Sequence, residues 1–174
     1  MRIAISGKSG CGNTTVCNLL SEKLGIPVVN FTFRQLAQEK GIDFWEFCAM
    51  AEKDDNIDRE LDSRMVQMAL KEENSILGSR LAIWNMKDAD LKVYLLASDE
   101  ERVRRITNRE GGSFEERLAQ TKSRDAHDSA RYKRIYGIDN SDTSIADLVI
   151  DTEGKTPEEI ADTIVRAVCT KIKK

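Results

Sequence analysis

Short apolar runs alternate with longer amphipathic segments along the chain. The runs have the length of buried strands and cover residues 3–5, 26–30, 75–78, 91–96 and 147–151. Between the first two runs, apolar residues recur on one helical face at Val16, Leu20 and Leu24, and Gly25 is placed to end that helix. The order strand, helix, strand is typical of parallel strands joined by right-handed crossovers. The pattern therefore predicts an α/β fold built on a five-stranded parallel sheet.

A charged helical segment at about 33–70 separates the second and third strands. It is broken near Gly41 and near residues 54–55. Its aromatic residues could form a small core of their own: Phe33, Phe44, Trp45 and Phe47. An insertion at this point of the chain has room to cover a substrate.

The later helices have recognisable start signals. Ser98 is placed to cap a helix over 99–109, and a second charged helix runs from Ser113 to about Tyr136. The last helix opens with Thr156 at the cap and proline at the first helical position.

Composition narrows the class of protein. The chain has 174 residues, 40% of them hydrophobic, which is enough for one sizeable core and predicts a single domain. Its net charge of −3 disfavours general nucleic-acid binding, because such proteins are usually strongly basic. No apolar run approaches the length of a membrane span, and Met1 leads directly into the first strand, so we expect no membrane association, no signal peptide and a cytoplasmic location. The four cysteines lack a Cys-x-x-Cys spacing, so we expect neither a zinc site nor disulfides.

The stretch that joins the first strand to the first helix is rich in glycine. Gly7, Gly10 and Gly12 allow backbone conformations closed to other residues, so that successive N–H groups can point at one anion. The helix that begins near Thr14 adds the positive end of its dipole. This spacing is that of the P-loop, G-x-x-x-x-G-K-[ST], and predicts a site for nucleotide phosphates. A glycine-rich turn without a ligand is the alternative.

Asn13 stands where the P-loop motif has lysine. That lysine normally brings a positive charge to the β and γ phosphates, whereas Asn13 offers only a dipole. Loss of one preorganised donor costs about 3–4 kcal/mol of transition-state stabilisation, so a competent catalyst would need another cation. Lys8, at the second position of the loop, is the candidate. The alternative is that Lys8 is a solvated side chain on an exposed turn.

Arginines follow the later strands. Arg80 comes directly after the third strand, and the carboxyl ends of parallel strands face the ligand crevice in open α/β sheets. Arg105 and Arg109 lie four residues apart on one helical face, where their like charges favour a bound anion such as phosphate. A solvated face balanced by nearby acids is the alternative.

A second basic group shares one helical face before the last strand. Arg124, Asp128 and Arg131 are spaced by four and three residues. The carboxylate could hold the two guanidiniums apart, and arginine forks bind phosphate oxygens bidentately. The trio could therefore close over a nucleotide, although an ordinary intrahelical salt-bridge ladder has the same spacing.

These features together resemble a nucleoside monophosphate kinase, and more narrowly the short, archaeal-type cytidylate kinases. The resembling stretches are the P-loop and residues 33–37, 57–62, 80–82, 89–95, 109–111 and 131–139. They span nearly the whole chain in the order of the family. The resemblance implies a three-layer P-loop NTPase fold over residues 1–174, with a helical NMP-binding insertion at about 31–73 and a helical lid at about 109–137.

The resemblance also implies roles for individual residues. ATP would be held by the P-loop, that is by Gly7, Lys8, Ser9, Gly10, Cys11, Gly12, Asn13, Thr14 and Thr15, with Thr14 also a ligand of Mg²⁺. The acceptor would be bound by Arg34, Arg80, Arg124, Asp128 and Arg131. The catalytic group would comprise Lys8, Arg105, Arg109 and Arg131. The implied reaction transfers the γ-phosphate of ATP to CMP or dCMP. We expect the protein to act as a monomer without nucleic-acid or membrane partners.

Several positions depart from the family pattern. Besides Asn13, Gly78 and Ser79 stand where an acid and a glycine are expected, and Val29 and Asn30 replace a serine and a glycine before the Arg34 helix. Whether these positions contact a metal ion or the nucleobase of the acceptor is therefore not determined by the resemblance. Two alternatives follow: a nucleotide-binding regulatory protein that has lost catalysis, or a kinase for another small acceptor such as shikimate.

Overall fold

The computed structural model describes residues 1–172, apart from the side chains of Trp45 and Ile172. The strands are β1 (Arg2–Gly7), β2 (Val28–Val29), β3 (Ser75–Gly78), β4 (Leu91–Leu96) and β5 (Leu148–Asp151). The helices are α1 (Asn13–Leu24), α2 (Phe33–Glu39), α3 (Phe44–Ala51), α4 (Asp55–Lys71), α5 (Ala82–Asn85), α6 (Asp99–Glu110), α7 (Phe114–Tyr136) and α8 (Pro157–Ile172). The short helix α5 was not expected from the sequence.

The five strands form one parallel sheet in the order β2-β3-β1-β4-β5. β1 lies at its centre, where Ile3 pairs with Ile76 of β3 on one side and with Leu91 of β4 on the other. Because the strands are parallel, the segments that follow β1, β3, β4 and β5 all leave the sheet at one edge.

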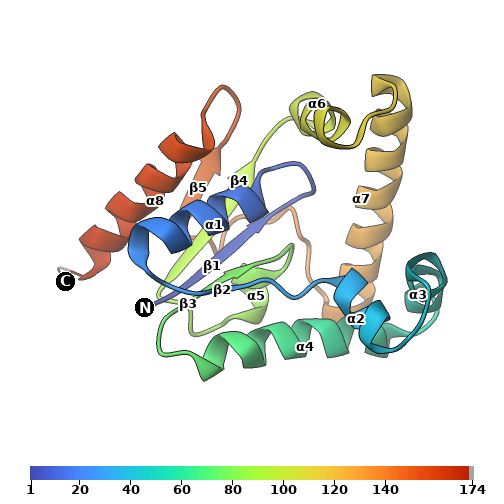
Figure 1. The fold of residues 1–174 in the computed structure, drawn as a ribbon, viewed down its shortest axis with the longest axis horizontal. Coiled ribbons are helices and arrows are strands. Elements are labelled where there is room, and N and C mark those ends of the chain that lie inside the picture. Colours follow the sequence, from blue (N-terminus) through green and yellow to red (C-terminus); the bar gives the residue numbers. More distant parts are fainter. Residues whose placement is uncertain (173–174) are drawn as a thin grey trace.

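Helices cover both faces of the sheet (Figure 1). On one face α1 and α8 lie side by side, and Ile5, Leu20 and Ile164 are fully buried between them and the strands. On the other face α4 and α5 pack against the strands around Leu77 and Ile83. The predicted three-layer α/β fold with a five-stranded parallel sheet is confirmed. Within residues 1–172, no helix has both the length and the apolar character needed to cross a membrane.

The segment between β2 and β3 consists of α2, α3 and α4. The rings of Phe33 and Phe47 lie 4.8 Å apart between centroids, as expected for an aromatic cluster. The prediction of a separate small core is wrong, however, because Phe47 belongs to the same buried cluster as Met65 of α4 and Ala4 of β1. The side chain of Trp45 lies outside the described residues.

Three helix boundaries predicted from the sequence are confirmed, one at the end of a helix and two at the start. Gly25 takes a left-handed conformation (φ 65°) at the end of α1, and its N–H donates to the carbonyl of Ser21. The Ser98 hydroxyl accepts a hydrogen bond from the N–H of Glu101 at the start of α6. Thr156 caps α8 in the same way, accepting from the N–H of Glu159.

Candidate active site

The glycine-rich loop leaves the carboxyl end of the central strand β1 and enters α1. Gly10 and Gly12 have φ values of +87° and +97°, a region that favours glycine. The same expectation for Gly7 is wrong, because its φ is not positive. A Cβ at Gly10 would lie 2.8 Å from the carbonyl oxygen of Arg102, so the loop also packs closely against α6. The loop therefore has the backbone that a phosphate cradle requires, at the amino end of a helix.

Asn13 folds back onto the loop. Its Nδ2 donates to the carbonyl oxygen of Gly7 at 2.9 Å. Its Oδ1 is buried and has no hydrogen-bond partner within the described part of the chain. Asn13 therefore joins the end of the loop to its beginning, and the amide nitrogen that could have faced a phosphate is already engaged.

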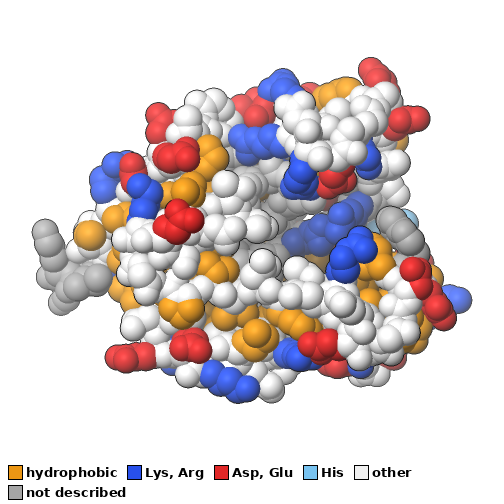
Figure 2. All heavy atoms as spheres, viewed as in Figure 1, with side chains coloured by type: hydrophobic (Ala, Val, Ile, Leu, Met, Phe, Trp, Pro, Cys, Tyr) orange, Lys and Arg blue, Asp and Glu red, His pale blue; other side chains and the backbone are white. Residues whose placement is uncertain are grey.

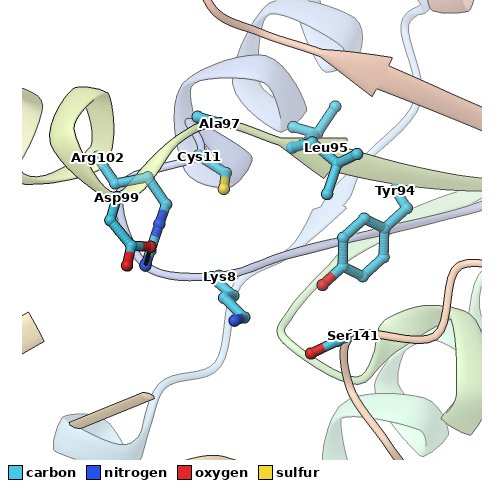
Figure 3. Close-up of a pocket in the computed structure, with 9 residues that line it drawn as sticks. Lys8, Cys11, Tyr94, Leu95, Ala97, Asp99, Arg102 and Ser141 are labelled. Atoms are coloured by element: carbon cyan, nitrogen blue, oxygen red, sulfur yellow. Dashed lines mark hydrogen bonds and ion pairs between the residues drawn. The ribbon is translucent and has the colours of Figure 1, made fainter. Parts of the chain in front are cut away.

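Lys8 lines a cavity of about 120 Å³ at the carboxyl end of β4 (Figure 3). Cys11, Tyr94, Arg102 and Ser141 are among the other residues that line this cavity. In Figure 3 the Lys8 side chain extends from the loop into the space between Asp99 and Arg102 on one side and Tyr94 and Ser141 on the other. Lys8 is half-buried, and no carboxylate of the described residues forms an ion pair with it. Its charge is thus available beside the loop.

Arg102 holds the loop, α6 and α7 together. Its guanidinium is almost fully buried and donates to the carbonyl of Ser9 at 2.9 Å. It also pairs with Asp99 at 2.7 Å and with Asp125 of α7 at 2.5 Å. Sequence reasoning assigns Arg102 no role of its own, since only Asp99 lies at a spacing that would signal a partner.

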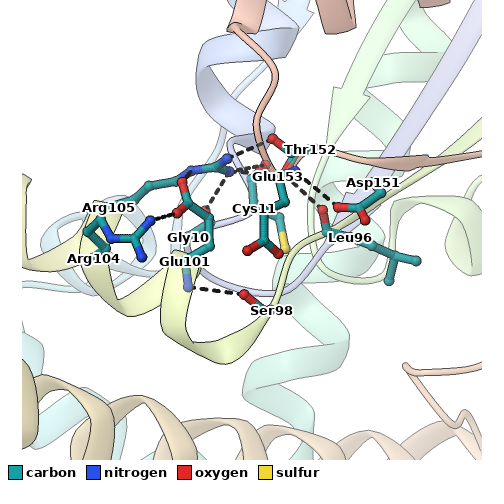
Figure 4. Close-up of polar contacts among 10 residues, drawn as sticks. All are labelled: Gly10, Cys11, Leu96, Ser98, Glu101, Arg104, Arg105, Asp151, Thr152 and Glu153. Atoms are coloured by element: carbon teal, nitrogen blue, oxygen red, sulfur yellow. Dashed lines mark hydrogen bonds and ion pairs between the residues drawn. The ribbon is translucent and has the colours of Figure 1, made fainter.

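Arg105 lies on the side of the loop that faces β5 (Figure 4). It donates to the hydroxyl and the carbonyl of Thr152 at 2.9 and 2.8 Å, and it pairs with Glu101 at 2.9 Å. Longer contacts reach the carbonyl oxygens of Gly10 and Cys11, at 3.4 and 3.5 Å. These contacts brace the loop against the end of β5. A role of Arg105 at the transferring phosphates stays a prediction.

Arg109 lies apart from this group. Its exposed guanidinium pairs with the neighbouring Glu110 at 2.5 Å, and this contact lowers the pKa of the Glu110 carboxyl. No described contact joins Arg109 to the P-loop or to the arginines of α7. Its predicted part in catalysis is neither supported nor contradicted by this position.

Asp128 brings two of the predicted substrate residues together. Its Oδ2 lies 3.3 Å from Nε of Arg80, which follows β3, and its Oδ1 accepts from Nη2 of Arg131 at 3.2 Å. Asp128 is only 5% exposed, so both ion pairs are shielded from water. Spacing on α7 predicted the pairing of Asp128 with Arg131. The contact between Arg80 and Asp128 could not be predicted from spacing, because it depends on how the chain folds.

Arg34 and Arg124 add positive charge to the same region. Arg34 of α2 stacks on the ring of Phe44, 3.9 Å from its centroid. Burial raises the pKa of the Cys48 thiol, and the nearby charges of Arg124, Arg131 and Arg34 oppose this rise. Figure 2 shows Lys and Arg side chains gathered in the hollow of this face. The site is therefore built for an anion.

A second layer of polar contacts joins α7 to α4. Asp58 of α4 is 4% exposed, and its Oδ2 lies 3.0 Å from Nε of Arg131. The hydroxyl of Tyr136 donates to Asp62 at 2.6 Å. Burial raises the pKa of Asp62 to about 6, against the opposing effect of the Tyr136 hydrogen bond. Sequence reasoning assigned no role to these acids, because their partners lie on another helix.

The residues around Thr14 fit a magnesium–nucleotide complex better than a free metal ion. Thr14, Asn18 and Asn30 offer oxygen atoms along the wall of a small cavity that Gly78 also lines. Mg²⁺ usually keeps several waters and takes other ligands from substrate phosphates, so few protein oxygens suffice. Within residues 1–172, no three His, Cys, Asp or Glu side chains are grouped as a metal site. A Cβ at Gly78 would lie 2.6 Å from Sγ of Cys17, so a larger residue at this position would require Cys17 to shift.

The loop after β1 and the sheet order define a P-loop kinase fold. The shikimate kinase of Bacteroides thetaiotaomicron superposes with a TM-score of 0.61 over 98% of both chains, at 16% sequence identity. At that identity the likeness shows the fold alone.

Sequence comparison identifies the family. The pattern of the cytidylate kinase-like family matches residues 2–154. Cytidylate kinase 2 of Borreliella afzelii (strain PKo) is 45% identical over 168 residues, which cover 94% of each chain. The cytidylate kinase of Archaeoglobus fulgidus is 39% identical over 173 residues, covering 98% of this chain and 96% of the relative. The chain belongs to the cytidylate kinase-like family.

Proposed function

We propose that the chain is a nucleoside monophosphate kinase that transfers the γ-phosphate of ATP to CMP or dCMP, giving ADP and CDP or dCDP. Membership of the cytidylate kinase-like family supports both the reaction and the acceptor. The P-loop supports the donor, because its backbone suits a nucleotide's phosphates.

The observation that carries the proposal is the joining of Arg80 and Arg131 by Asp128. Arg80 follows β3 and Arg131 lies on α7, and the buried carboxylate holds both. Together with Arg34 and Arg124 they form a positive surface for the acceptor phosphate. Arginine is suited to this task since its fork binds phosphate oxygens bidentately.

On the donor side, Gly7 through Thr15 hold the phosphates of ATP. Lys8 supplies the positive charge that Asn13 lacks, because Lys8 pairs with no carboxylate among the described residues whereas Asn13 is engaged with Gly7. Thr14 would hold Mg²⁺, and the bound ion would supply charge neutralisation at the nucleotide's phosphates.

Catalysis rests on positioning and on charge. The acceptor phosphate oxygen is largely ionised at neutral pH, so no general base is needed, and the phosphoryl group passes directly between nucleotides. Arg131, and in this proposal Arg105 and Arg109, stabilise the charge that develops on the group in transfer. The insertion (about 31–73) and the lid (about 109–137) close on both substrates and exclude water, which would otherwise hydrolyse ATP.

A panel of acceptors tests this function. The purified chain is supplied with ATP and Mg²⁺ and with CMP, dCMP, UMP, AMP or shikimate, and ADP release is followed. We expect turnover with CMP or dCMP to exceed that with the other acceptors. ATP binding without ADP release for any acceptor, or preferred turnover of shikimate, would contradict the proposal. The cytoplasmic location and the monomeric state stay predictions.

A further inference from the structure

The guanidinium of Arg131 is held from two directions. Asp58 of α4 lies 3.0 Å from its Nε, and Asp128 of α7 accepts from its Nη2 at 3.2 Å. Both carboxylates are at least nine-tenths buried. Nε of Arg131 and Oδ2 of Asp58 are both buried and make no hydrogen bond, so the contact between them is an ion pair only. Within the described part of the chain, the remaining nitrogen, Nη1, has no hydrogen-bond partner, and it is not among the buried unpaired atoms. One edge of the guanidinium is thus fixed by protein, and the other is open.

Asp58 itself sits in a row of contacts between α4 and α7. Asp55, Asp58 and Asp62 recur every three or four residues and therefore share one face of α4. Asp55 pairs with Arg134 at 2.6 Å, and Asp62 accepts from the Tyr136 hydroxyl at 2.6 Å. In Figure 1 the carboxyl-terminal end of α7 meets the amino-terminal end of α4. This half of α7 is therefore anchored to α4.

We propose that Asp58 is a positioning residue for phosphoryl transfer: it fixes Arg131 so that the open edge of the guanidinium faces the phosphate of the acceptor nucleotide. This inference rests on the proposed function, since it assigns Arg131 a substrate. Asp58 contacts the substrate only through Arg131. A bidentate phosphate contact needs the fork in one orientation, and an arginine freed from Asp58 would sample several.

Asp58→Asn tests the proposal with a closely matched control. The variant keeps the shape of the side chain and removes its charge. Asp55→Asn makes the same change one turn earlier on α4, in the exposed pair with Arg134. Since misplacement of a catalytic contact by about 1 Å can cost about 100-fold in rate, we expect Asp58→Asn to lower kcat with CMP by about 30- to 100-fold and to leave the KM of ATP within about twofold. For Asp55→Asn, we expect both kcat with CMP and the KM of ATP to stay within about twofold of the values of the unsubstituted chain.

A double-variant cycle separates positioning from a general loss of stability. If Asp58 acts through Arg131, then Asp58→Asn should change kcat by less than about threefold in an Arg131→Ala background. The same 30- to 100-fold loss in that background would overturn the proposal, as would an Asp58→Asn variant that behaves like Asp55→Asn. If Asp58→Asn does not fold, Asp58→Glu serves instead: it keeps the charge but moves the carboxylate, so full activity of that variant would overturn the proposal and a loss of about tenfold or more in kcat would support it.

The test distinguishes this inference from the proposed function. An inactive unsubstituted chain would refute the kinase function itself. An active chain whose Asp58→Asn variant keeps its kcat would refute only the role of Asp58.

Discussion

The positive charge of Arg80 is close enough to Arg124 to lower the pKa of the Arg124 guanidinium. Arg80 has a carboxylate partner in Asp128, whereas Arg124 forms no ion pair with a described carboxylate. Two like charges that face each other repel until an anion joins them. The acceptor region is thus electrostatically unsatisfied in the protein alone.

Arg124→Gln should therefore separate stability from binding. Without ligand, we expect the variant to be as stable as the unsubstituted chain or more stable, by about 0.5 kcal/mol, because surface charge pairs are worth little. The KM of CMP should rise by about tenfold or more, since a hydrogen bond to a charged group contributes about 1.5–3 kcal/mol. Urea unfolding and ADP release measure the two quantities. A destabilised variant with an unchanged KM would show that Arg124 is structural.

Lys8→Ala and Asn13→Ala should differ in the property that they damage. Loss of a charge aimed at the transition state lowers kcat by about 100-fold or more, so we expect that loss for Lys8→Ala. Asn13→Ala removes the hydrogen bond to Gly7 and should cost about 1 kcal/mol of stability with a smaller fall in kcat. Steady-state kinetics ranks the two variants. The opposite ranking in kcat would remove Lys8 as the cation that compensates for Asn13.

Gly10→Ala and Gly12→Ala test the geometry of the loop. Both glycines have positive φ, which costs an alanine about 1–2 kcal/mol. Only at Gly10 would the new Cβ also meet backbone, 2.8 Å from the carbonyl oxygen of Arg102, whereas the space beside Gly12 is open. Such overpacking adds about 1–3 kcal/mol, so Gly10→Ala should be clearly the less stable variant in urea unfolding. Equal stabilities would mean that the loop does not pack on α6 as described.

We expect the free energy of unfolding to depend on pH through Asp62. Its pKa is raised by burial to about 6 in the folded protein, above its ordinary value of 3.8. The folded state therefore binds the proton more tightly than the unfolded state, and this group's contribution to stability is lost as pH rises from about 4 through about 6.

Asp62→Asn removes that loss and can still accept the hydrogen bond of Tyr136. Relative to the unsubstituted chain, the variant should gain stability across this pH range, by an amount on the order of 3 kcal/mol. Urea unfolding between pH 4 and pH 8 measures the difference. Stability curves that stay parallel throughout would show that Asp62 is not perturbed.

Local signals in the sequence were sufficient for the order of the strands and of the longer helices, but not for the short helix α5. The apolar runs predicted the five strands, and Gly25, Ser98 and Thr156 marked helix ends, because caps and hydrophobic periodicity act over a few residues. The order of strands in the sheet depends on pairings across the whole chain, such as Ile3 with Leu91, and local pattern does not determine it.

The same limit applies to the site. Arg124, Asp128 and Arg131 could be grouped from their spacing on one helix. Arg102 was overlooked, since two of its partners, Ser9 and Asp125, lie on other elements. Asp58 has no recognisable role in the sequence for the same reason, although residues 57–62 belong to the stretches that resemble the family. A side chain buried between two elements gives no signal in the sequence of either one.

Transfer of a labelled phosphoryl group tests the central claim most directly. The chain is incubated with Mg²⁺, CMP and ATP labelled in the γ-phosphate, and the labelled products are separated. Direct transfer predicts that the label appears in CDP, with little in inorganic phosphate. Label found only in inorganic phosphate, or left in ATP while CMP is bound, would contradict the account of this chain as a kinase.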